Sequence, residues 1–162
     1  MNTRASTGVP GLDEVLRGGL PRDRIYLVQG DPGVGKTTVG LQFLLEGRDR
    51  GEKCLYIALS ETRPEIDGVV DSHGWDLSGI EVVELSAIDQ SAGLEEQNSL
   101  FQASEVELNE TTRVLLSHVE RVNPDRVVFD SLSELRLLAQ NALRYRRQIS
   151  ASSSTSATRS RP

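Results

Sequence analysis

The feature that most constrains the fold is a glycine-rich loop between a short apolar run and an amphipathic run. The loop has the pattern G-x-x-x-x-G-K-T over residues 30–37. In such a loop the glycines let the backbone curl, so that successive N–H groups and the N-terminus of the next helix point at a polyphosphate. The order of strand, loop and helix therefore predicts a phosphate-binding loop rather than a simple glycine-rich turn.

The side chains of this loop have separate expected roles. Lys36 is expected to reach the β- and γ-phosphates of a nucleotide, and the Thr37 hydroxyl is expected to bind Mg²⁺. The predicted nucleotide-binding residues are Gly30, Asp31, Pro32, Gly33, Val34, Gly35, Lys36, Thr37 and Thr38.

Apolar and amphipathic runs alternate along the chain. The predicted strands cover residues 25–29, 53–60, 80–85 and 125–130. The predicted helices cover residues 36–50, 62–73, 104–122 and 131–149, preceded by a short helix that opens at Pro10. Capping patterns of the S/T-x-x-E type predict helix starts at Thr62, Ser104 and Ser131. This alternation is typical of an α/β fold with a mostly parallel sheet flanked by helices.

Carboxylates follow two of the predicted strands. Asp130 is expected to position Mg²⁺ and its water shell, the Walker B role. Glu61 is a candidate for the general base that orients water onto the γ-phosphate, although the sequence equally allows a solvated carboxylate at the start of the next helix. Because ligands collect at the carboxyl ends of parallel strands, Lys36, Glu61 and Asp130 are predicted to converge.

Composition narrows the classes of function. A chain of 162 residues suits one domain, and its net charge of −6 should repel nucleic acid and anionic membranes. No run of about 18 apolar residues is present, so no membrane span is expected. The single cysteine, Cys54, lies in an apolar strand pattern, which predicts a reduced core thiol in a soluble cytoplasmic protein.

Several spaced signatures resemble the KaiC-type ATPase domain of the RecA superfamily of P-loop NTPases. They are residues 7–13 (TGVPGLD), 18–21 (GGLP), the glycine loop, 42–44 (QFL) and 74–77 (GWDL). The resemblance runs from about residue 6 to Ile149 and is greater to bacterial KaiC-like ATPases than to the circadian clock protein.

The resemblance implies a set of ligands, partners and roles. It implies that the nucleotide is ATP with Mg²⁺, bound at a subunit interface of a homo-oligomeric ring, usually a hexamer. It also places a catalytic glutamate at the end of the second strand. Clock-type members often have two glutamates there, whereas this chain has Ser60-Glu61, so only Glu61 carries the role over.

The C-terminal residues depart from the family pattern. Residues 150–162 contain nothing more apolar than alanine, which predicts a disordered Ser/Thr-rich tail after an ATP-binding domain at residues 1–149. The resemblance implies a later strand between the phosphate-loop strand and the Walker B strand, so the domain is expected to lack its C-terminal strands. A truncated or frame-shifted copy with impaired catalysis is the resulting hypothesis.

The leading functional prediction is Mg²⁺-dependent ATP hydrolysis with Lys36 and Glu61 as catalytic residues. One alternative is a Ser/Thr autokinase of the clock type, which stable labelling by γ-phosphate-tagged ATP would reveal. A second alternative is a nucleotide-dependent signalling or interaction module that binds ATP with little turnover. DNA binding of the recombinase kind follows from the superfamily, but it conflicts with the acidic charge.

Overall fold

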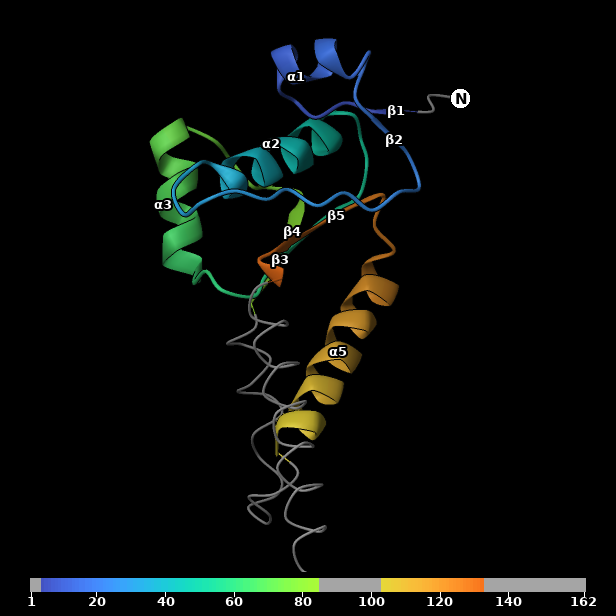
Figure 1. Cartoon of the computed structure of the whole chain (residues 1–162), viewed down its shortest axis with the longest axis vertical. Helices are drawn as coiled ribbons and strands as arrows, with labels where there is room; N and C mark the ends of the chain where they lie inside the picture. Colours follow the sequence, from blue (N-terminus) through green and yellow to red (C-terminus); the bar gives the residue numbers. More distant parts are fainter. Residues whose placement is uncertain (1–3, 85–102, 133–162) are drawn as a thin grey trace, which may run out of the picture.

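The computed structural model describes residues 4–84 and 103–132. Its central feature is a parallel sheet of three strands in the order β4-β3-β5. The elements are β1 (Arg4–Ala5), α1 (Pro10–Val15), β2 (Leu20–Pro21), α2 (Lys36–Asp49), β3 (Cys54–Ala58), α3 (Arg63–His73), β4 (Ile80–Glu84), α5 (Ala103–Val122) and β5 (Arg126–Asp130). The predicted α/β class is confirmed (Figure 1).

Strand β3 lies at the centre of the core because both of its faces are covered. Tyr56 packs with buried residues of α2 and α3, whereas Leu55 and Ile57 pack with Leu115 of α5. Successive side chains of a strand point to opposite faces, and every residue of β3 is buried. Burial on both faces explains why no residue of β3 is charged. Helices α2 and α3 therefore cover one face of the sheet, and α5 covers the other (Figure 1).

The predicted strand over residues 25–29 does not form, and the prediction is wrong. The segment is irregular, and its apolar side chains face solvent, with Ile25 100% and Leu27 74% exposed. A strand is stable only where a neighbour pairs with its backbone N–H and C=O groups. In the described part of the chain the parallel sheet consists of β4, β3 and β5, and none of these strands pairs with residues 25–29.

The other predicted elements within the described residues form. Helix α5 begins one residue earlier than predicted, at Ala103. The capping box before α3 is present, because the Glu65 carboxylate accepts hydrogen bonds from Thr62 N–H at 2.7 Å and Thr62 Oγ1 at 2.9 Å. The polar stretch at residues 86–102, and the predicted last helix and tail from residue 133 onward, lie outside the described residues.

Arg126, at the start of β5, joins the N-terminal segment to the layered core. Its buried guanidinium donates to the carbonyl oxygens of Ser6 at 2.6 Å and Phe43 at 2.8 Å, and it pairs with Glu52. Burial raises the pKa of Glu52, but hydrogen bonds from Arg126 and Arg22 outweigh this and lower it. These contacts hold α2 against β5.

Candidate functional site

The glycine loop leads directly into α2. Gly33 and Gly35 have φ of 81° and 92°, in the left-handed region that favours glycine. Gly35 is the residue before α2, and its carbonyl accepts the first helical hydrogen bond, from Val39 N–H at 3.0 Å. The first N–H groups of a helix have no partner within it. The loop and α2 therefore present backbone donors where an anionic phosphate would bind.

The Lys36 ammonium lies over the loop. Its Nζ donates hydrogen bonds to the carbonyl oxygens of Gly30 at 3.1 Å and Asp31 at 2.9 Å. The positive charge is thus held beside the same backbone turn whose N–H groups would contact phosphate. This placement suits a lysine that neutralises phosphate charge.

Thr37 and Asp130 are brought together from distant parts of the chain. Thr37 Oγ1, in the first turn of α2, donates a 2.6 Å hydrogen bond to Asp130 Oδ2 at the end of β5. Asp130 is only 7% exposed. The close approach of α2 to β5 passes through Gly40, where an added Cβ would lie 3.1 Å from Val128 Cγ1. A hydroxyl and a carboxylate are hard oxygen ligands of the kind that Mg²⁺ prefers, so these residues fit that ion.

Glu61 lies just beyond the end of β3. Burial raises its pKa, and the negative charge of Asp130 raises it further, while the charge of Lys36 acts in the opposite direction. Its Oε2 is buried and accepts no hydrogen bond from the described residues. A carboxylate of raised pKa is the stronger base, which suits proton abstraction from water. Glu61 thus lies close enough to Asp130 and Lys36 for both charges to affect its pKa.

Three polar residues of this region were not predicted from the sequence. Tyr56 Oη donates a 2.8 Å hydrogen bond to Asp130 Oδ2. The Ser60 and Ser131 hydroxyls lie 3.0 Å apart and join the ends of β3 and β5. Only Tyr56 carried a usable signal, because a tyrosine inside a buried apolar strand needs a partner for its hydroxyl.

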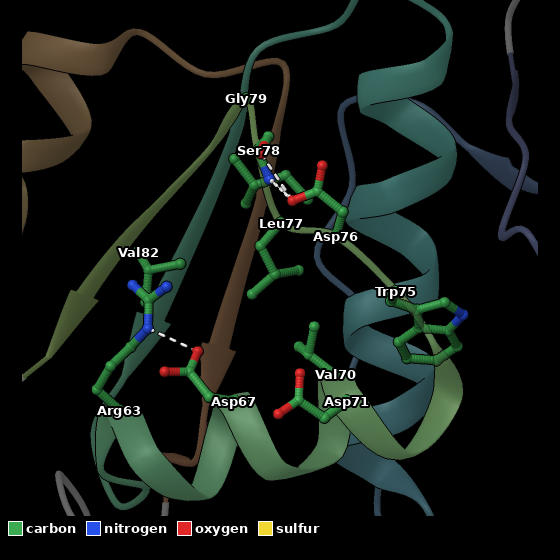
Figure 2. A pocket seen from close by; sticks show the side chains of 11 residues that line it. Arg63, Asp67, Val70, Asp71, Trp75, Asp76, Leu77, Ser78, Gly79 and Val82 are labelled. Atoms are coloured by element: carbon green, nitrogen blue, oxygen red, sulfur yellow. Dashed lines mark hydrogen bonds and ion pairs between the residues drawn. The ribbon is translucent and has the colours of Figure 1, made fainter.

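A pocket of about 390 Å³ lies away from the loop, between α3 and β4 (Figure 2). Arg63 and Asp67, paired at 2.8 Å, line it together with Trp75 and Leu77. No predicted site residue lines it. Its other charged residues are carboxylates, which would repel phosphate. We therefore place the candidate site at the glycine loop, where the donors and oxygen ligands converge.

Comparison with known proteins identifies the family of the chain. The family model described as "ATPase: KaiC" matches residues 5–154. The chain is 34% identical over 140 residues to a UPF0273 protein of Pyrococcus horikoshii, an alignment that covers 83% of this chain and 57% of the relative. It is 31% identical over 140 residues to a UPF0273 protein of Thermotoga maritima, with 83% and 58% covered.

A third relative, a UPF0273 protein of Methanopyrus kandleri, is 33% identical over 137 residues, with 82% of this chain and 54% of the relative covered. The chain thus spans about half the length of the curated relatives it matches. None of the helices in the described residues combines the length and apolar character needed to cross a bilayer.

Proposed function

Because the chain belongs to the KaiC family of ATPase domains, we propose that it binds ATP with Mg²⁺ and hydrolyses the ATP to ADP and phosphate. The observation that carries the proposal is the hydrogen bond between Thr37 Oγ1 and Asp130 Oδ2 beside the glycine loop. It joins the hydroxyl expected at the ion to the carboxylate expected to hold the ion's water shell. The two residues are 93 positions apart in the chain, so only the folded sheet brings them together.

The proposed binding step uses the backbone and two side chains. The N–H groups of the loop and the first turn of α2 hold the phosphates, and Lys36 offsets their charge. Thr37 donates its hydroxyl hydrogen bond to Asp130, which leaves an oxygen lone pair of Thr37 for the cation. When bound, Mg²⁺ supplies electrostatic stabilisation of the β- and γ-phosphate oxygens.

The proposed chemical step uses Glu61. Its carboxylate accepts a proton from the water that attacks the γ-phosphate, and its raised pKa favours that transfer. The charge of Asp130 contributes to this raised pKa, which supports a base near the metal-binding carboxylate. Ring assembly from copies of this chain, a signalling protein as partner and residence in the cytoplasm are further proposals that follow from family membership.

Binding and turnover are tested separately with two substitutions. Lys36→Ala is expected to abolish ATP binding, measured by calorimetry, because it removes the charge that faces the phosphates. Glu61→Gln is expected to retain binding but to lower phosphate release about 100-fold or more, because the amide cannot accept the proton. Lys53→Ala, at an exposed lysine before β3, is the matched control and should change neither.

The same experiment separates ATP hydrolysis from its alternative, nucleotide binding without turnover. That alternative is favoured by the exposed residues 25–28, which lead into the loop without a neighbouring strand in the described part of the chain. Tight binding by the unmodified protein, with phosphate release no faster than in Glu61→Gln, would establish the alternative. Absence of binding would refute both functions.

A further inference from the structure

We propose that Tyr56 is a positioning residue for the metal-binding carboxylate. Its hydroxyl, together with that of Thr37, engages one oxygen of Asp130 and leaves the other oxygen for the water shell of Mg²⁺. The inference rests on the proposed nucleotide function and assigns a role to a residue that neither the glycine loop nor the sequence signatures include.

The geometry around Asp130 carries the inference. Tyr56 Oη lies 2.8 Å from Oδ2, and Thr37 Oγ1 lies 2.6 Å from the same atom. Both groups are O–H donors, so Oδ2 accepts a hydrogen bond from each. Among the described residues no hydrogen bond to Oδ1 is present, so the two hydroxyls converge on one side of the carboxylate.

Packing of the core does not require the hydroxyl of Tyr56. Its ring is fully buried in the core cluster that contains Leu41, Leu44 and Ile66, and a phenylalanine ring would fill the same space. A buried hydroxyl costs free energy unless it is hydrogen-bonded, and among the described residues its partner is Asp130. The polar atom is therefore best explained by the carboxylate that it holds.

Tyr56 contributes a donor that carries no charge, through the hydrogen bond from its hydroxyl to Asp130 Oδ2. A neutral donor orients the carboxylate without competing for the cation, as partners of metal-ligating groups commonly do.

The test compares ADP binding with and without Mg²⁺, measured by calorimetry on the whole chain. Tyr56→Phe is expected to weaken ADP binding about tenfold in the presence of Mg²⁺, because one hydrogen bond to a charged group is lost. Binding without Mg²⁺ should be unchanged, since the loop and Lys36 remain. A merely structural loss would weaken both equally.

Tyr26→Phe is the matched control. Tyr26 donates its hydroxyl to the carbonyl oxygen of Pro21 at 2.9 Å, away from Asp130, so its loss should leave both affinities unchanged. A second variant, Asp130→Asn, tests whether Tyr56 acts through the carboxylate. In that background, Tyr56→Phe should add no further loss.

The outcomes are distinguishable. If the unmodified protein binds no nucleotide, the proposed function is wrong and the role of Tyr56 falls with it. If it binds ADP more tightly with Mg²⁺ but Tyr56→Phe retains that gain, only the role of Tyr56 is overturned. If Tyr56→Phe weakens binding further in the Asp130→Asn background, Tyr56 does not act through Asp130, and the inference is also overturned.

Discussion

At the scale of single residues, the two carboxylates of the site differ in their effect on stability, because Asp130 has hydrogen-bond donors and the Oε2 of Glu61 has none among the described residues. Asp130 is satisfied by two hydroxyl donors. Glu61, by contrast, is partly buried beside that carboxylate, and its Oε2 accepts no hydrogen bond from the described residues. An ionised carboxylate in such a place costs free energy, and active sites often retain groups of this kind because the chemistry needs them.

Glu61→Gln is therefore expected to raise the free energy of unfolding near pH 7 while it removes turnover. The folded state raises the pKa of Glu61, so the protonated carboxyl favours folding. This contribution of Glu61 to the free energy of unfolding is fully present below the unfolded-state pKa and is lost as pH rises through the folded-state pKa. The advantage of the glutamine variant should thus shrink as pH falls. Urea unfolding between about pH 7 and about pH 4 measures this difference. A glutamine variant less stable than the unmodified protein near pH 7 would contradict it.

At the scale of elements, the position of α2 depends on small residues and buried side chains beneath it. A Cβ added at Gly47 would lie 2.5 Å from Arg126 Cδ and 2.9 Å from Cys54 Sγ. Arg126 is itself held by Ser6 and Phe43, so it has little freedom to move. The C-terminal part of α2, the helix that carries Thr37, is thus held in place by its packing against Arg126.

Gly47→Ala is expected to destabilise the protein by about 1–3 kcal/mol, because the added methyl group forces Arg126 or α2 to shift. Gly68→Ala is the matched control, since Gly68 lies within α3 and an added Cβ meets nothing within 4 Å. The control should gain about 0.5–1 kcal/mol from helix propensity. Thermal unfolding of both variants checks the pair. Equal effects would show that packing beneath α2 does not decide its position.

At the scale of the whole molecule, the sequence largely predicted the layered core but not the irregular conformation of residues 25–29. Residues 53–60 and 25–29 have similar apolar patterns, yet only the first forms a strand. Strand formation depends on a neighbour, which is a property of the pairing and not of the segment. The hydroxyl of Tyr56 needs a partner, but Asp130, 74 positions away, could not be identified as that partner for the same reason. The loop was predictable because its backbone geometry depends on local glycines.

The exposed apolar segment has a consequence that can be measured. Ile25→Lys with Leu27→Lys is expected to lower nucleotide-free self-association about tenfold or more, because two exposed apolar side chains are replaced. Thermal stability should not fall, since neither side chain is packed. Val15→Lys, at an exposed position of α1, is the matched control and should not change association. Light scattering across a concentration series measures it, and unchanged association in the double variant would contradict the expectation.

Among the described residues, the glycine loop is joined to the parallel sheet on its α2 side alone. Thr37 is bonded to Asp130, whereas residues 25–29 enter Gly30 as exposed, irregular chain. Ordering that entry costs about 1–2 kcal/mol of backbone entropy per residue. Binding of a nucleotide to the loop and pairing of a strand with β5 would both require this ordering, so the second event would not pay its entropy again. Each event would therefore raise the affinity of the protein for the other by the same factor. The loop would then become ordered mainly when the nucleotide and the neighbouring strand are both bound.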